Sequence, residues 1–182
     1  MVEASAALEG RQAKLWGAAD ALTALRLPLA AAFVLVTDPG WRLAILAVAA
    51  GSDLLDGRIA RRFGASRLGV FLDPVADKLF MAAAFWVVLV SRRLEVFEIV
   101  GVLLRDIVAS IAFVVTLRGG HPSSIPARAG GKAVTLAQNL TLLAFVSGSE
   151  FLRPMAWATA AIAIYAIWDY VQARGAQRPV GT

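Results

Sequence analysis

The sequence predicts an all-α integral membrane protein with about six transmembrane helices, and two observations lead to this fold class. Hydrophobic residues make up 59% of the 182 residues, and the mean hydropathy of +0.69 lies well above that of typical soluble domains. Long apolar runs also recur along the chain, separated by short segments rich in polar residues, Gly and Pro. We expect one domain over residues 1–182, because no internal repeat divides the chain.

Six segments are expected to cross the membrane. They are residues 20–37, 41–62, 68–91, 96–117, 131–145 and 151–173. An Asp-Pro-Gly turn at 38–40 ends the first segment, and the Gly- and Pro-containing residues 119–126 separate the fourth from the fifth. Five crossings is the alternative, since several apolar runs reach the roughly 20 residues of a full span only when their polar ends are included.

The N-terminal residues are expected to lie outside these six segments. Residues 8–17 mix Leu and Trp with two cations, as in a short amphipathic helix at the membrane interface. A disordered tail is the alternative. Residues 1–16 carry two acids and lack an apolar stretch behind a basic start, so we do not interpret them as a cleaved signal peptide.

The distribution of cations predicts the orientation of the chain. Six crossings place both termini on one side, together with the second-to-third and fourth-to-fifth connections. The cations expected on that side are Arg11, Lys14, Arg58, Arg61, Arg62, Arg67, Arg118, Arg128, Lys132, Arg174 and Arg178. The opposite side carries Arg42, Arg92, Arg93 and Arg153. Because cations concentrate in cytoplasmic loops, we expect a bacterial inner-membrane protein with its termini in the cytoplasm.

The net charge of +5 indicates which partners the protein meets. A basic excess in a membrane chain fits anionic lipid headgroups and phosphate-bearing substrates. Nucleic acid is not expected, because no basic stripe alternates with exposed aromatic residues.

Four aspartates stand inside otherwise apolar sequence around a polar turn at 61–67. Asp53 and Asp56 are spaced i,i+3, and Asp73 and Asp77 are spaced i,i+4, so each pair shares one face if its segment is helical. Asp53 and Asp77 are equally distant in sequence from Ala65. If the chain reverses there, the two pairs meet at one depth and form a single acidic cluster near the cytoplasmic side.

Four carboxylates at close range repel one another unless a cation compensates their charge. The chain contains no cysteine, and its single histidine, His121, lies far from these residues in the sequence. Oxygen-only ligands favour Mg²⁺ or Mn²⁺ over zinc, and a cluster this rich suits two ions. Gly57 and Gly69 lack side chains and leave room for a ligand phosphate beside the metal.

The spacing of these residues resembles the signature of the CDP-alcohol phosphatidyltransferase family. The shared pattern is D-x2-D-G-x2-A-R-x7-G-x3-D-x3-D, carried by Asp53, Asp56, Gly57, Ala60, Arg61, Gly69, Asp73 and Asp77. The spacer before Gly69 is one residue shorter than in many members. The apolar runs at 45–50 and 79–90 on either side argue against the alternative, a solvated charged helix pair on a soluble surface.

The resemblance implies an enzyme that displaces CMP from CDP-diacylglycerol with an alcohol hydroxyl and depends on a divalent metal. It further implies that Asp53, Asp56 and Asp73 bind metal and that Asp77 is both metal ligand and general base. The resemblance also implies that the CDP-lipid is bound by Gly57, Ala60, Arg61 and Gly69. A homodimer is also implied by the resemblance alone.

The acceptor alcohol is indicated by two cues that disagree. Gly131-Lys132-x-x-Thr135-x-x-Gln138 is similar to an element of members that accept glycerol 3-phosphate, whereas Arg105-Asp106 is similar to a pair in cardiolipin synthases of the same family. We expect glycerol 3-phosphate, with phosphatidylglycerol as the alternative. Arg105, Arg128 and Lys132 are the candidate ligands of the acceptor phosphate, unless they anchor helix ends at lipid phosphates.

Several alternatives stay open. Arg26 either reaches the interface or turns inward to a substrate phosphate, and Asp169 either lies at the interface or satisfies a neighbouring helix. Outside this enzyme class, a divalent cation or proton transporter would also line a cavity with carboxylates. Such transporters usually contain two related halves with broken helices, and this chain has one acidic hairpin.

Overall fold

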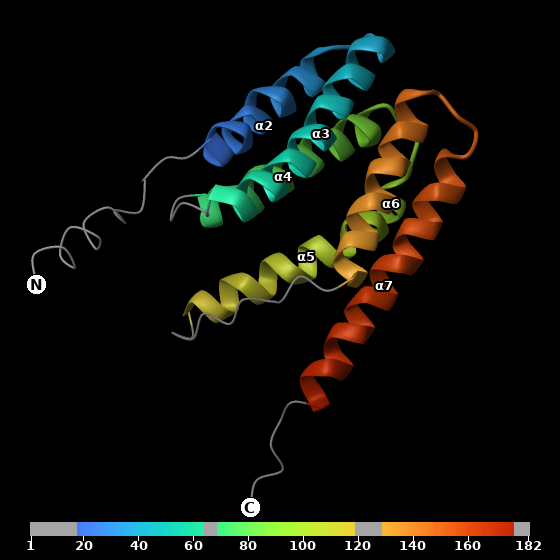
Figure 1. The fold of residues 1–182 in the computed structure, drawn as a ribbon. Coiled ribbons are helices and arrows are strands. Elements are labelled where there is room, and N and C mark those ends of the chain that lie inside the picture. The colour runs from blue at the N-terminus through green and yellow to red at the C-terminus, as the bar shows by residue number, and fades with distance from the viewer. Residues whose placement is uncertain (1–17, 64–68, 119–128, 177–182) are drawn as a thin grey trace, which may run out of the picture. The chain divides into compact units, whose positions relative to one another are not determined.

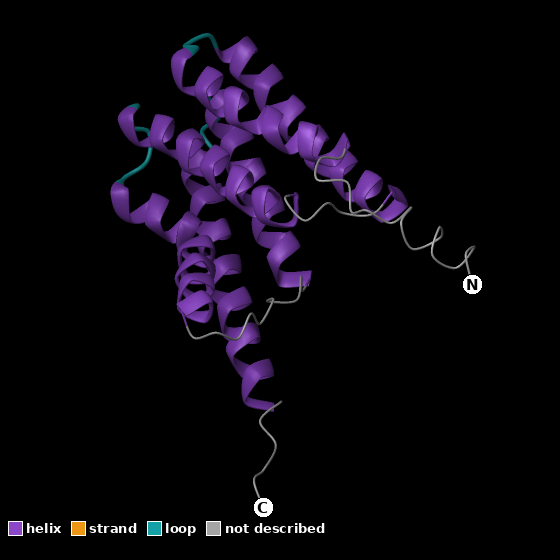
Figure 2. Cartoon of the chain, turned by 90° about the vertical axis from the view of Figure 1, so that its left-hand side faces the viewer, coloured by secondary structure: helices purple, strands orange, loops and turns teal. Residues whose placement is uncertain are grey.

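The computed structural model describes residues 18–63, 69–118 and 129–176. These residues form α2 (Ala18–Leu35), α3 (Pro39–Phe63), α4 (Gly69–Val90), α5 (Val96–Arg118), α6 (Ala129–Val146) and α7 (Leu152–Ala176) (Figure 1). Figure 2 shows helices and no strand in this part of the chain. The all-α prediction is confirmed, and each helix begins and ends within three residues of its predicted segment. The predicted interfacial helix at 8–17 lies outside the described residues.

Over the ranges given above, none of the helices is both long and apolar enough to cross a membrane.

Local capping explains where the helices begin and end. The Asp38 carboxylate accepts a hydrogen bond from the Trp41 amide at 2.9 Å, and Pro39 is the first residue of α3, which is the favoured arrangement at a helix N-terminus. Gly148, with φ of 68°, ends α6. The amides of Ser149 and Gly148 donate to the carbonyls of Ala144 and Phe145, a Schellman motif.

The chain divides into two compact units, Met1–Ala84 and Phe85–Thr182, and the division falls within α4. We describe each unit by itself. The prediction of one domain over the whole chain stays a prediction.

In the first unit, α2 packs against α3, and the rings of Phe33 on α2 and Phe80 on α4 meet edge to face at 6.0 Å. Figure 1 shows α3 and α4 running in opposite directions. The Arg42 guanidinium donates to the Val36 carbonyl at 2.8 Å and lies 5.7 Å from the centre of the Phe33 ring. These contacts fix the turn between α2 and α3.

In the second unit, α7 packs against both α5 and α6. Small residues allow the close approach, since a Cβ added to Gly101 on α5 would lie 3.1 Å from the Ala160 Cβ on α7. Polar contacts also link these helices. The Thr141 and Thr159 hydroxyls pair at 2.9 Å, and Arg153 donates to the buried Glu98 carboxylate at 3.0 Å.

Candidate functional site

The sequence-predicted site residues fall in both units. In the first unit, Asp53 and Asp56 lie on α3, and Asp73 and Asp77 lie on α4. All four aspartates are therefore helical, as the i,i+3 and i,i+4 spacing arguments require. Gly57, Ala60 and Arg61 also lie on α3, and Gly69 is the first residue of α4.

The side chains of most of these residues lie outside the described part of the structure. Asp77 is the exception, and it is half-buried beside the fully buried Ala76. Among the described side chains, no group of three or more His, Cys, Asp or Glu residues is close enough together to hold a metal ion. The predicted metal site stays a prediction, because three of its four ligands, Asp53, Asp56 and Asp73, are not among those side chains.

Arg26 on α2 is also part of the first unit. Its exposed fraction is only 3%, although it lies about two turns into an apolar helix. This burial favours the interpretation in which the guanidinium turns inward over the one in which it reaches the interface.

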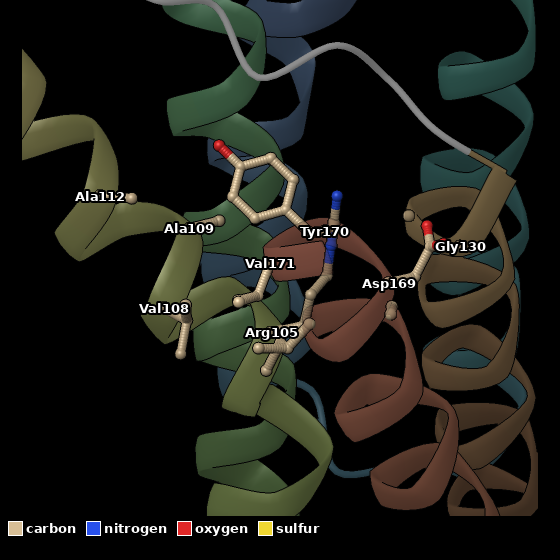
Figure 3. A pocket seen from close by; sticks show the side chains of 11 residues that line it. Arg105, Val108, Ala109, Ala112, Gly130, Asp169, Tyr170 and Val171 are labelled. Carbon is tan, nitrogen blue, oxygen red and sulfur yellow. The ribbon is translucent and has the colours of Figure 1, made fainter. Parts of the chain in front are cut away.

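The second unit contains a pocket of about 140 Å³ between α5, α6 and α7. Its charged lining residues are Arg105 and Asp169, and the Tyr170 ring forms part of the wall. Figure 3 shows the Arg105 side chain extending between those of Tyr170 and Asp169 in this view. Small residues provide much of the space; they are Ala109, Ala112, Gly130, Gly131 and Ala166.

The glycines at the start of α6 set how closely it approaches its neighbours. A Cβ added to Gly131 would lie 2.5 Å from Nη2 of Arg105, and one added to Gly130 would lie 3.2 Å from the Ala166 Cβ. The Arg105 guanidinium therefore rests against the backbone at Gly131. Any larger residue at 131 would displace the guanidinium, because it is the mobile end of a long side chain.

A hydrogen-bonded chain connects the pocket cation to α6. Gln138 Nε2 donates to Asp106 Oδ2 at 2.7 Å and to the Val102 carbonyl at 3.0 Å. The other oxygen of Asp106, Oδ1, accepts from Arg105 Nη1 at 3.4 Å. Arg105 and Asp106 are both partly buried, with side chains exposed by 29% and 21%.

The structure describes two of the three residues that were predicted to bind the acceptor phosphate. Arg105 lines the pocket, as a ligand of an anionic acceptor should. Lys132 is exposed and is not among the described residues that line it, and Arg128 lies outside the described residues. The role of each of the three in binding the acceptor stays a prediction.

The sequence analysis assigned neither Asp169 nor Tyr170 to a pocket. A signal was present: Ala163 and Ala166 are buried at i,i+3 spacing, and Asp169 follows three residues later. A polar residue that continues a stripe of small buried residues faces a neighbouring helix.

The chain was compared with known proteins. A family model described as CDP-alcohol phosphatidyltransferase matches residues 16–168. The chain is 31% identical over 177 residues to "Probable phosphatidylglycerophosphate synthase" of Mycobacterium tuberculosis strain H37Rv, covering 88% of this chain and 82% of that protein. It is 32% identical over 181 residues to "CDP-diacylglycerol--glycerol-3-phosphate 3-phosphatidyltransferase" of Escherichia coli K12, covering 86% and 92%.

A third relative carries a different name. It is "Putative cardiolipin synthase" of Mycobacterium bovis, to which the chain is 32% identical over 163 residues, covering 82% of this chain and 77% of that protein. The matched residues 16–168 include the whole acidic pattern as well as Arg105 and Gln138.

Proposed function

Because the chain belongs to the CDP-alcohol phosphatidyltransferase family, we propose that it transfers the phosphatidyl group of CDP-diacylglycerol to glycerol 3-phosphate and releases CMP. Two relatives that align with most of the chain are named for a synthase of phosphatidylglycerophosphate or for this transfer. The choice of acceptor depends on one observation: the Arg105 guanidinium lines a small pocket beside Gly131. Gly131 is the first residue of the element that is similar to one in members that accept glycerol 3-phosphate.

In the proposed reaction, the acceptor hydroxyl oxygen forms a bond to the phosphorus atom that carries diacylglycerol. The bond from this phosphorus to the oxygen that links it to CMP breaks, and CMP leaves. Asp77 takes the hydroxyl proton. A half-buried carboxylate on a helix suits this role, because it is held in place yet can be reached by a substrate.

The donor set fits the divalent metal that the family pattern implies. Asp53, Asp56, Asp73 and Asp77 offer only carboxylate oxygens, which are the ligands that Mg²⁺ and Mn²⁺ prefer. We propose that these four residues hold one or two such ions, which when bound neutralise the diphosphate of the donor lipid. Gly57, Ala60, Arg61 and Gly69 are proposed to contact the CDP group.

The pocket residues support a small anionic acceptor. The planar guanidinium of Arg105 can bind two oxygens of one phosphate at once. A phosphate monoester carries more negative charge than the diester of phosphatidylglycerol, so it gains more from this cation. Lys132 and Arg128 are proposed as further ligands of the acceptor phosphate.

A cardiolipin synthase that uses phosphatidylglycerol is the second candidate. It is favoured by the Arg105-Asp106 sequence and by the name of the M. bovis relative. A direct comparison of the two acceptors decides between these candidates.

We further propose that the protein is embedded in the bacterial inner membrane, with its termini and the α3–α4 turn in the cytoplasm. The mean hydropathy of +0.69 and the cation distribution support this location. Large apolar side chains are also exposed on α5 and α7, among them Ile111, Val115, Trp157 and Ile164, which is costly in water.

Because the chain contains no cysteine, single introduced thiols can test the orientation. An impermeant thiol reagent should label Glu150→Cys from outside intact cells and Ala65→Cys only after permeabilisation. The opposite pattern would overturn the proposed orientation, and labelling of both from outside would favour five crossings.

The activity is tested with purified protein in detergent, CDP-diacylglycerol, Mg²⁺ or Mn²⁺, and radiolabelled glycerol 3-phosphate or phosphatidylglycerol. We expect label from glycerol 3-phosphate in the lipid phase, with one CMP released per lipid formed. Asp77→Asn should lower turnover by about 10²- to 10⁴-fold. Asp38→Asn is the matched control, since Asn also caps helices well and Asp38 lies at the other end of α3.

Two results would contradict the proposal. Turnover with phosphatidylglycerol alone would identify a cardiolipin synthase. No turnover with either acceptor, together with metal flux into liposomes that contain the protein, would favour a transporter.

A further inference from the structure

Gln138 is the most deeply buried polar side chain near the pocket. Its exposed fraction is 1%, and it lies on α6 one turn before Thr141. Burying an amide costs free energy unless its donors are satisfied. Both of the hydrogen bonds that Nε2 donates reach α5, one to the Val102 carbonyl at 3.0 Å and one to Asp106 Oδ2 at 2.7 Å.

These two bonds fix the direction of the Asp106 carboxylate. The bond to Val102 anchors the amide on the backbone of α5, one turn before Asp106. The second bond then holds Oδ2, so that Oδ1 faces the Arg105 guanidinium. The 3.4 Å separation between Oδ1 and Nη1 makes this contact an orienting attraction and leaves guanidinium hydrogens available for a ligand.

Gly131 completes the arrangement from the other side. The guanidinium rests against the Gly131 backbone, where even a Cβ would come within 2.5 Å of Nη2. Arg105 is thus held between Asp106 and the first turn of α6. The same helix provides both Gly131 and Gln138.

We infer that Gln138 and Asp106 are positioning residues, which hold the Arg105 guanidinium in the pocket so that it binds the phosphate of the acceptor. This inference rests on the proposed function, in which Arg105 is the phosphate ligand. A held guanidinium loses less conformational entropy when it binds than a free one. Gln138 therefore acts on acceptor affinity through Asp106 and Arg105, without touching the substrate.

Thr141 provides the internal comparison for this inference. It lies on the same helix, is also fully buried, and also makes an interhelical hydrogen bond, to Thr159 at 2.9 Å. Neither threonine lines the pocket or contacts Arg105 among the interactions of the described residues. A purely structural role for Gln138 predicts that both residues affect only stability.

The test measures KM for glycerol 3-phosphate and for CDP-diacylglycerol in Gln138→Met and Thr141→Val. Met keeps the length of Gln without its donors, and Val keeps the shape of Thr. We expect the acceptor KM of Gln138→Met to rise about tenfold, as for the loss of one hydrogen bond to a charged group. The donor-lipid KM should not change, and Thr141→Val should change neither KM.

A double-variant cycle with Arg105→Ala separates the inference from the proposed function. If Gln138 acts through Arg105, Gln138→Met should raise the acceptor KM no further in the Arg105→Ala background. A raised KM in Arg105→Ala with an unchanged KM in Gln138→Met overturns the positioning role and leaves the proposed function intact. An unchanged acceptor KM in Arg105→Ala overturns the assignment of Arg105 as the phosphate ligand, and the positioning role with it. The transfer activity itself fails only if the wild-type protein does not turn over glycerol 3-phosphate.

Folding of Gln138→Met is checked by its thermal unfolding midpoint and by the upward shift that glycerol 3-phosphate adds to it. If this variant does not fold, the same measurements are made on Asp106→Asn. The Asp106 side chain is partly exposed, and Asn has the same shape as Asp, so this variant is expected to fold. A tenfold rise in acceptor KM supports the inference there too. An acceptor KM equal to that of the wild type overturns it.

Discussion

The two groups of candidate site residues, one in each unit, differ in how they are distributed along the sequence. The predicted metal ligands occupy one segment of 25 residues, from Asp53 to Asp77, on consecutive helices. The pocket instead joins Arg105, Gly131 and Asp169 from three helices. The placement of residues on consecutive helices can be predicted from spacing along one segment, whereas a pocket lined by three helices depends on how those helices pack.

We expect the acidic residues and the pocket residues to affect different kinetic constants. If the acidic residues carry the chemistry, changes there should lower kcat for every acceptor. If the pocket binds the acceptor phosphate, changes there should raise the acceptor KM selectively. The following predictions test this division.

The largest effect is expected from metal removal. Chelation should lower turnover by at least about 10²-fold, because several kcal/mol of charge stabilisation disappear from the transition state. Mg²⁺ or Mn²⁺ added back in excess should restore it. Full activity after exhaustive chelation, verified by metal analysis, would break the assignment of Asp53, Asp56, Asp73 and Asp77 as ligands.

Arg105→Ala should raise the KM for glycerol 3-phosphate by about 10- to 100-fold, the worth of charge-assisted hydrogen bonds to a phosphate. The KM for CDP-diacylglycerol should stay unchanged. Arg153→Ala is a suitable control, since Arg153 pairs with Glu98 and does not line the pocket. Equal loss of affinity for donor and acceptor would remove the distinction between the two regions.

Gly131→Ala sharpens the comparison within the second unit. The added methyl group would displace the Arg105 guanidinium, so we expect a several-fold higher acceptor KM. Stability should be kept, because Ala favours a helix by about 1 kcal/mol over Gly. Gly101→Ala should do the reverse. The new Cβ would lie 3.1 Å from the Ala160 Cβ, and overpacking of about 1–3 kcal/mol is offset in part by the helix preference of Ala, so we expect a net loss of stability with an unchanged KM. Unfolding midpoints and steady-state kinetics of both variants test this.

The smallest effect is expected at Glu98. This buried carboxylate accepts hydrogen bonds from the Glu95 amide at 2.9 Å and from Arg153 at 3.0 Å. Glu98→Gln should lower the free energy of unfolding by about 1 kcal/mol and leave both KM values unchanged. Glu95→Gln is the matched control, because Glu95 is exposed and 3.8 Å from Arg153, so no measurable change is expected. Similar losses in both variants would indicate that burial does not decide the effect.

The fold was predictable largely because turn chemistry marks the helix ends. Asp38 caps α3 as the Asp-Pro-Gly sequence predicts, and the ends of all six helices follow the apolar runs within three residues. The membrane location was inferred from overall hydropathy and stays a proposal. No helix of the described residues reaches the length and hydropathy of a full span.

The pocket was only partly predictable. Arg105 was singled out because Arg105-Asp106 resembles a pair in members of the family, but the orientation of its side chain was not predicted. Gln138 was noted only as the last residue of a sequence motif. Its hydrogen bond to Asp106 was not predicted, because the two residues are 32 positions apart in the sequence. Asp169 gave no decisive signal, because a single acid near two aromatic residues at a helix end is equally typical of an interface.

By itself, the sequence determined the bounds of the helices in the described part of the chain, the family, and the placement of four aspartates on two consecutive helices. These properties depend on spacing along one segment, and helical geometry converts such spacing directly into a shared face. Only the tertiary structure decided that Gln138 donates to Asp106 and that Asp106 and Gly131 lie next to the Arg105 guanidinium. The placement of α5 and α6 against α7 depends on the volumes of many packed side chains at once, which no short stretch of sequence contains.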